Sequence, residues 1–261
     1  MSTVSSSDGT AIAFDRSGEG PPVILVGSGP TDRSANVPLA VLLAQHFTVV
    51  NYDRRGRGDS GDTAPYAVDR EFDDIAALVS EAGGSVYMFG TSGGGMIALE
   101  AAARGLDITK LAVWEPPYIV DASRPPVPAD YRQQLADLLA AGRRGDMVEL
   151  FFTQATGMPA EFVAPMRQSP FWPAMEKVAH ALVYDAMIAG DFSLPAARLA
   201  AVTVPTLVID GGTTPWLSNT AQAVAAALPD VRRRTLTGQP HNVDPAVLAP
   251  ALVEFFTGAP V

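Results

Sequence analysis

Short apolar runs alternate with longer amphipathic segments along most of the chain. Apolar and β-branched runs predict buried strands at 21–29, 47–53, 85–90, 108–117 and 202–212, and all of them except 47–53 end in glycine or proline. Helices are predicted between them, for example over 69–82, where acidic residues in the first turn precede an apolar stripe. This alternation is typical of a mostly parallel sheet flanked by helices.

The pattern changes between about 116 and 199. Strand signals stop there, and helical segments rich in Met, Phe, Trp and Tyr replace them. Strand and helix alternation returns after residue 200. We therefore predict one α/β core formed by 1–115 and 200–261, interrupted by an all-helical cap or lid at 116–199.

Composition narrows the classes of partner and compartment. The chain has 261 residues, a net charge of −10, no cysteine and no Lys/Arg-rich run beyond "RRR" at 232–234, which we interpret as a solvated strand edge. We do not expect nucleic acid as a partner, because a protein with this negative charge repels a polyanion. Disulfide and thiolate chemistry are excluded because the chain has no cysteine. The N-terminus does not resemble a signal peptide, and no apolar stretch approaches a membrane span, so a cytoplasmic protein is expected.

A lone serine lies among glycines between a predicted strand and a predicted helix. Gly90-Thr91-Ser92-Gly93-Gly94 matches G-x-S-x-G, in which a sharp turn presents a nucleophile above the sheet. The following helix N-terminus offers free N–H groups to a developing oxyanion. The alternative is a structural strand–helix turn, but the combination of motif and context favours a nucleophilic Ser92.

The chain resembles the α/β-hydrolase superfamily over almost its whole length. The resemblance is carried by the serine motif and by two further segments, "NYDRRGRGDSGD" (51–62) and "GQPHNVDP" (238–245). The resemblance implies an α/β-hydrolase fold and a catalytic base late in the chain, which is His241 here. His46, at a helix end, is better explained as a capping or packing residue, and His180, within a helix of the insertion, as a packed or pocket-lining residue. Neither a metal ion nor a cofactor is expected.

The third member of the triad departs from the usual pattern. Most members of this superfamily carry an Asp in the loop after the strand that reads "PTLVID" here, but Thr214 stands at that place. The candidates are Glu115, at the end of "AVWEPP", and Asp210, at the end of its own strand. We favour Glu115, because "AVWEPP" resembles the corresponding stretch of lactonases that open zearalenone and because a buried carboxylate there needs a partner.

The oxyanion hole is expected to combine the N–H of Gly93 with one N–H from the loop after the strand at 21–29. Gly29 is the favoured donor in that loop and Ser28 is the alternative, since Pro30 has no N–H. Apolar side chains near the nucleophile and from the insertion should form the substrate pocket. The residues predicted to line it are Pro30, Met96, Tyr118, Phe171, Trp172, Tyr184 and Trp216.

These residues predict a serine hydrolase that cleaves an uncharged, fairly apolar carboxylic ester or lactone through an acyl-enzyme on Ser92. The fold also allows a cofactor-free lyase or cyclase, a haloperoxidase-like enzyme or a small-molecule binding protein. The expected partner is a small molecule, with neither nucleic acid nor membrane involved. The sequence leaves the oligomeric state open.

Overall fold

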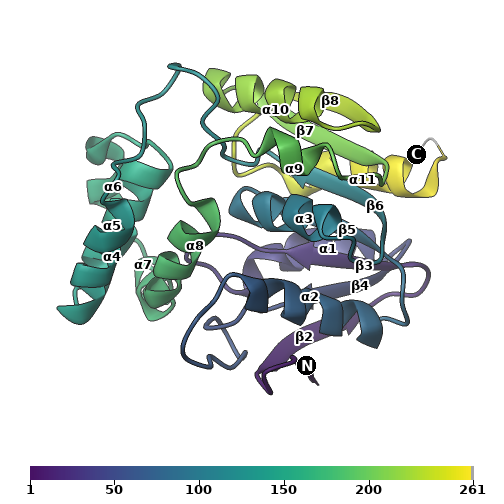
Figure 1. The fold of residues 1–261 in the computed structure, drawn as a ribbon, viewed down its shortest axis with the longest axis horizontal. Coiled ribbons are helices and arrows are strands. Elements are labelled where there is room, and N and C mark those ends of the chain that lie inside the picture. Colours follow the sequence, from purple (N-terminus) through teal and green to yellow (C-terminus); the bar gives the residue numbers. More distant parts are fainter. Residues whose placement is uncertain (260–261) are drawn as a thin grey trace.

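An eight-stranded sheet forms the centre of the protein in a computed structural model that describes residues 1–259. In chain order the strands are β1 (Ser2–Ser5), β2 (Ala11–Ser17), β3 (Pro22–Val26), β4 (Thr48–Tyr52), β5 (Val86–Thr91), β6 (Ile108–Trp114), β7 (Thr206–Gly212) and β8 (Val231–Gln239). Their spatial order is β1-β2-β4-β3-β5-β6-β7-β8 (Figure 1). β2 runs antiparallel to both of its neighbours and the other pairs are parallel, which confirms the predicted mostly parallel sheet.

Helices cover both faces of this sheet (Figure 1). One face packs against α2 (Asp69–Glu81), α3 (Gly93–Ala103) and α10 (Pro215–Ala227). The other face packs against α1 (Val37–Leu43) and α11 (Pro245–Thr257). A short 3-10 turn, η1 (Arg33–Asn36), leads into α1.

Strand β3 explains why the buried strands are continuously apolar. Val23 and Leu25 belong to the core beneath α1 and α11, whereas Ile24 and Val26 belong to the core beneath α2 and α3. Because successive side chains point to opposite faces, a strand covered on both sides needs an apolar residue at every position.

Between β6 and β7, a segment that the structure describes completely, the chain forms helices and no strand. These elements are α4 (Tyr131–Ala140), α5 (Arg144–Leu150), the π-helical turn η2 (Phe151–Ala155), α6 (Ala160–Met166), α7 (Trp172–Lys177), the 3-10 turn η3 (Ala179–Ala181), α8 (Leu182–Ala189) and α9 (Ala196–Leu199). Figure 1 shows α4, α5, α6 and α7 grouped at one end of the molecule. They share an apolar core of their own that includes Leu135, Met147 and Trp172.

The two ends of this helical segment belong to the main domain. Tyr118 and Leu199 are buried in the core beneath α2 and α3 rather than in the core of the inserted helices. α9 packs against α3 and α10. The part that stands away from the sheet is therefore shorter than the predicted 116–199.

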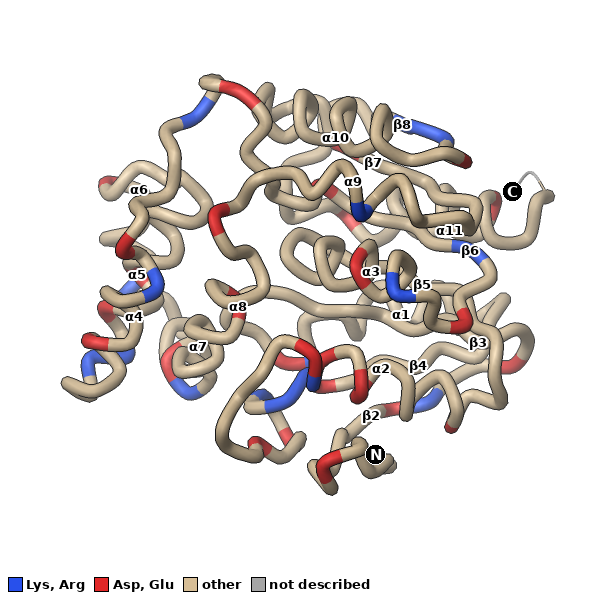
Figure 2. The backbone as a smooth tube through the Cα atoms, viewed as in Figure 1, with Lys and Arg blue, Asp and Glu red and all other residues tan. Residues whose placement is uncertain are grey.

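The predicted solvated strand edge at 232–234 carries two ion pairs. The three arginines at 232–234 lie on β8 at the edge of the sheet (Figure 2), where Arg233 pairs with Asp210 and Arg234 with Glu254. Within residues 1–259, no helix is both long enough and apolar enough to cross a membrane.

The register of the parallel strands determines where the site forms. Thr91 of β5 lies opposite Trp114 of β6, and Trp114 lies opposite Ile209 of β7. The residues that follow these strand ends therefore emerge at one edge of the sheet. Two of them are Ser92 and Glu115.

Candidate active site

Ser92 occupies a strained turn between β5 and α3. Its backbone has φ 52° and ψ −125°, a left-handed conformation that is costly for a residue with a side chain. The turn closes because two positions lack a Cβ: a methyl group on Gly90 would collide with the Gly94 carbonyl, and one on Gly94 with the Val26 carbonyl. The spacing of glycines in the motif therefore has a steric cause.

His241 lies beside this serine, after β8. Its Nε2 is 3.1 Å from the Ser92 Oγ, and its Nδ1 is 2.7 Å from Oε2 of Glu115. A histidine that carries its proton on Nδ1 and donates it to a carboxylate leaves Nε2 free to accept the serine proton. The three side chains thus form one continuous hydrogen-bonded chain.

Glu115 is held rigidly at the end of β6. Its side chain is 0% exposed, and its second oxygen, Oε1, accepts a hydrogen bond of 2.9 Å from the Gly211 N–H. Its backbone has φ 43°, and its N–H donates to the Ile209 carbonyl. Both carboxylate oxygens are therefore satisfied, one by the histidine and one by a neighbouring strand.

Asp210, the alternative acid, is used elsewhere. Its carboxylate accepts hydrogen bonds from the hydroxyls of Ser218 and Thr235 and pairs with Arg233. It is 1% exposed and ties β7 to α10 and β8. Of the two candidate acids, the structure places only Glu115 against His241.

The loop after β3 lies across from Ser92. The Gly93 N–H, the expected oxyanion donor, donates to the Ser28 hydroxyl at 3.0 Å. Gly29 has φ 63° and packs close to the ring of Phe151. Its carbonyl accepts from Arg57 Nε at 3.3 Å. The three residues expected around the oxyanion hole are therefore adjacent, and a substrate carbonyl must displace the Ser28 hydroxyl to reach the Gly93 N–H.

Ser92 and His241 open into a cavity of about 500 Å³ between the sheet edge and the inserted helices. Most of the side chains around it are apolar, including Met96, Phe151, Phe152 and Phe192. Cavities of this size and character are typical of small-molecule sites. The arrangement supplies a nucleophile, a base, a carboxylate and an apolar chamber.

The sequence profile of the alpha/beta hydrolase family matches residues 23–251. This chain belongs to the alpha/beta hydrolase family. An alpha/beta hydrolase from Sphaerobacter thermophilus DSM 20745 is 57% identical and superimposes with a TM-score of 0.94 over 98% of this chain and 100% of that one.

Two other known proteins are less similar to this chain. The uncharacterized hydrolase YraK of Bacillus subtilis (strain 168) is 34% identical over 100 residues, which span 37% of each chain. A thermophilic esterase from Thermogutta terrifontis is 23% identical, with a TM-score of 0.72 over 98% of both chains, and shares the fold.

Within this alpha/beta hydrolase, two of the seven predicted pocket residues, Met96 and Trp216, line the cavity. Thr214, which replaces the usual acid, lines it as well. The Arg124 guanidinium lies over the ring of Trp216, 4.7 Å from the ring centroid, in a cation–π contact. Arg124 in turn donates to the carbonyls of Ala155 and Gln154.

The other five predicted pocket residues lie elsewhere. Phe171 is 74% exposed on the surface, and Trp172 is buried inside the inserted helices with its indole N–H on Glu176. Tyr184 stacks on Tyr66 and donates to Asp62. Pro30 and Tyr118 are buried without facing the cavity, and the neighbouring Pro117 faces it instead.

These differences have one physical reason. A run such as "SPFWPAM" predicts a helix with large apolar side chains, but its packing decides which face is turned to the substrate. The cavity is instead lined by η2 and α8, through Phe151, Phe152, Asp185 and Ile188. The break in helical geometry at η2 carries no sequence signal that we recognised.

The remaining histidines are apart from the site. His180, in η3, lies 3.4 Å from Asp62, and burial lowers its pKa, with Arg144 and Arg57 contributing in the same direction. His46 is exposed at the end of α1. Within residues 1–259, no group of three or more His, Cys, Asp or Glu side chains is arranged to hold a metal ion.

Proposed function

We propose that this chain is a serine hydrolase that cleaves uncharged, fairly apolar carboxylic esters or lactones through an acyl-enzyme on Ser92. One observation carries the proposal. The hydrogen-bonded chain Ser92–His241–Glu115 ends at a serine hydroxyl that opens into an apolar cavity.

The first step is attack by the Ser92 oxygen on the substrate carbonyl. His241 Nε2, at 3.1 Å, takes the serine proton as the C–O bond forms, and the imidazolium is stabilised by the Glu115 carboxylate at 2.7 Å. The tetrahedral oxyanion is stabilised by N–H groups of Gly93 and the loop after β3. His241 then gives its proton to the departing alkoxide, which leaves as an alcohol.

The second step releases the acid. A water molecule gives a proton to His241 and attacks the acyl carbon, and the proton returns to the Ser92 oxygen as the ester bond to the enzyme breaks. In a lactone the alcohol and acid belong to one molecule, so a single hydroxy acid is released. Either substrate needs the same residues.

The cavity supports an uncharged substrate. No Lys or Arg is among its lining residues in the part of the chain that the structure describes, so nothing there neutralises an anionic substrate directly. The volume of about 500 Å³ favours small molecules over polymers. The apolar walls favour burial of hydrocarbon groups.

The test is turnover of p-nitrophenyl alkanoates and neutral lactones by the wild type and Ser92→Ala. We expect a burst of p-nitrophenol equal to the enzyme concentration when deacylation is slower than acylation, and a loss of kcat of at least about 10³-fold in the variant. Unchanged turnover in folded Ser92→Ala, or no turnover of any ester or lactone, would contradict the proposal.

A further inference from the structure

One phenol lies in the buried part of the cavity wall. Tyr131 begins α4, lines the cavity and is only 4% exposed. It belongs to the apolar core of the inserted helices together with three other lining residues, Ala155, Ala186 and Phe192. The side chains of those three are entirely apolar. The Tyr131 hydroxyl is therefore the one polar side-chain group among these four residues.

The Tyr131 hydroxyl is open to the cavity and has no partner. Within residues 1–259 no hydrogen bond reaches it, and the neighbouring Asp185 acts on it only through its charge. Tyr52 shows the contrast, because its hydroxyl also lacks a partner but is closed to water. The Tyr131 hydroxyl is not among such closed atoms, and the cavity is the open space that this side chain borders. A ligand in the cavity can therefore contact it.

Packing holds this phenol in a fixed place. The ring of Phe192 meets the ring of Tyr131 edge-on, with the centroids 6.4 Å apart. Phe192 itself has φ 63°, a left-handed conformation that is costly for a bulky residue. Its backbone is tied on both sides, by a 2.8 Å bond to the Ala189 carbonyl and a 2.8 Å bond from the Ile119 N–H. Such strain is typical of ligand sites, and here it lies beside an unpaired hydroxyl.

The surroundings of Tyr131 keep its hydroxyl protonated. Burial raises its pKa, and the negative charge of Asp185 raises it further. Asp185 is held in place by two arginines, since its Oδ1 accepts 2.8 Å hydrogen bonds from Arg54 Nη1 and Arg57 Nη2. The phenol thus remains a hydrogen-bond donor at neutral and alkaline pH.

Tyr131 and Ser92 belong to different walls of the cavity. Ser92 follows β5 at the edge of the sheet, whereas Tyr131 begins α4, which Figure 1 shows apart from the sheet. A substrate that fills the cavity displaces any water that solvates the phenol. A hydrocarbon chain would then leave the O–H unpaired, whereas an oxygen acceptor would replace the lost hydrogen bond.

We propose that Tyr131 is a specificity-determining residue that donates a hydrogen bond to an uncharged oxygen of the substrate, remote from the carbonyl that Ser92 attacks. A ketone, an ether or a second ester group supplies such an acceptor. This inference rests on the proposed hydrolase function and narrows its substrates to esters or lactones that carry a second oxygen function.

The test moves a ketone along the acyl chain. Each p-nitrophenyl oxoalkanoate is compared with the p-nitrophenyl alkanoate of the same chain length, after subtraction of uncatalysed hydrolysis. A ketone accepts but does not donate, so it examines the donor role of Tyr131 alone. For the wild type we expect the ratio of kcat/KM, oxo ester over alkanoate, to peak at one ketone position, about tenfold or more above the other positions. This arm depends on no substitution.

Tyr131→Phe supplies the second arm. It keeps the ring that packs against Phe192 and removes only the hydroxyl. At the best position we expect kcat/KM for the oxo ester to fall by about tenfold or more. For the alkanoate, kcat/KM should stay within about threefold of wild type or rise, since the chain no longer covers an unpaired O–H.

Tyr52→Phe is the matched control. It removes an unpaired hydroxyl from a buried residue of β4 that does not line the cavity. The ratio of oxo ester to alkanoate should keep its wild-type value at every ketone position.

The outcomes separate this inference from the proposed function. A flat wild-type profile, an unchanged ratio in Tyr131→Phe, or equal losses for both substrates in that variant would each overturn the role of Tyr131 while the hydrolase activity stands. If neither kind of ester is turned over, the proposed function fails and the inference fails with it.

Discussion

The indole N–H of Trp114 donates a hydrogen bond of 2.8 Å to the backbone carbonyl of His241. The next residue in the chain, Glu115, accepts from the imidazole of the same histidine. The end of one strand therefore holds both the backbone and the ring of His241. This double attachment orients a side chain that would otherwise be free in a loop.

Trp114→Phe tests the backbone attachment. The ring remains to fill the buried space, but the hydrogen bond to His241 is lost, so kcat should fall by about three- to tenfold, as expected for one neutral hydrogen bond. KM should change little, since Trp114 does not line the cavity. Steady-state kinetics with a p-nitrophenyl alkanoate measure both constants.

Trp172→Phe is the matched control for that variant. It removes an indole hydrogen bond of 2.9 Å to Glu176 within the inserted helices. It should leave kcat within about twofold of wild type, while lowering the free energy of unfolding about as much as Trp114→Phe does. Equal losses of kcat in both variants would show that the Trp114 effect is general destabilisation.

Glu115→Gln and Asp210→Asn distinguish the two candidate acids. The glutamine cannot stabilise the imidazolium and can hold the wrong histidine tautomer, so we expect kcat to fall by roughly 10³–10⁴-fold. Asp210→Asn should retain kcat within a few-fold, because Asp210 bonds Ser218, Thr235 and Arg233 and not the histidine. Comparable losses in both variants would contradict this assignment.

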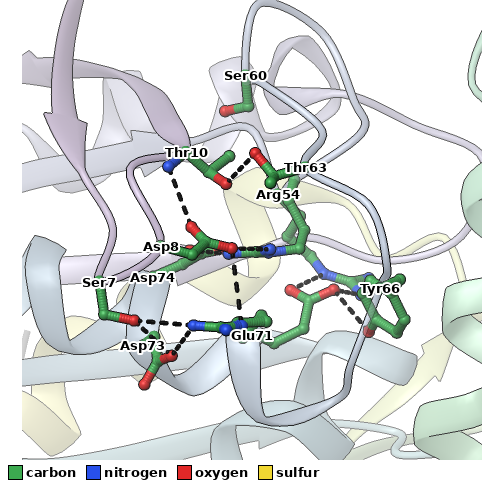
Figure 3. Close-up of polar contacts among 12 residues, drawn as sticks. Ser7, Asp8, Thr10, Arg54, Ser60, Thr63, Tyr66, Glu71, Asp73 and Asp74 are labelled. Atoms are coloured by element: carbon green, nitrogen blue, oxygen red, sulfur yellow. Dashed lines mark hydrogen bonds and ion pairs between the residues drawn. The ribbon is translucent and has the colours of Figure 1, made fainter.

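Asp74→Asn tests the buried charges between the loop after β4 and α2. Asp74 and Arg55 are joined at 2.7 Å with both side chains 0% exposed, and Arg55 also reaches Asp8 (Figure 3 shows Asp8 and Asp74 in this network). Loss of one charge leaves Arg55 incompletely paired, so the free energy of unfolding should fall by about 3–5 kcal/mol. Urea denaturation at neutral pH measures the change.

The neighbouring Asp73 provides the control for that prediction. Its side chain is 39% exposed and contacts Arg70 and Ser7 at the surface. Asp73→Asn should therefore change the free energy of unfolding by no more than about 0.5 kcal/mol. A similarly small change in Asp74→Asn would contradict the account of a tightly coupled buried pair.

His180 predicts a dependence of stability on pH. Burial lowers its pKa, Arg144 and Arg57 lower it further, and Asp62 opposes them. The unfolded chain therefore binds this proton first, so the free energy of unfolding falls as the pH drops through the ordinary histidine value of 6.5 toward the lower folded-state pKa. His180→Gln should show a shallower decline, whereas the exposed His46→Gln should match the wild type. An unchanged slope in His180→Gln counts against this prediction.

The order of elements and the position of the candidate triad could be predicted because both depend on local patterns. Buried strands read as apolar runs, and the glycines around Ser92 are required by close backbone contacts. Glu115 could be predicted for two reasons. An acid at the end of an apolar strand needs a partner, and Thr214 stands at the position where most members of the superfamily carry the acid that pairs with the histidine.

The pocket wall could not be predicted because it depends on contacts between distant segments. Arg54 and Arg57 lie in a polar turn by sequence, yet both are buried against Asp185, 131 and 128 positions away. Phe171 and Phe151 are both phenylalanines of the inserted segment, but the packing of the inserted helices exposes the first and turns the second to the cavity. Such choices are made by tertiary structure.

The most direct test of the account is labelling with an alkyl fluorophosphonate, followed by peptide mass spectrometry, on the wild type, Glu115→Gln and Asp210→Asn. We expect rapid phosphonylation of Ser92 in the wild type and in Asp210→Asn, and labelling slowed by at least about 10²-fold in Glu115→Gln. An unlabelled Ser92 in folded wild-type protein, or equal labelling rates in wild type and Glu115→Gln, would contradict it.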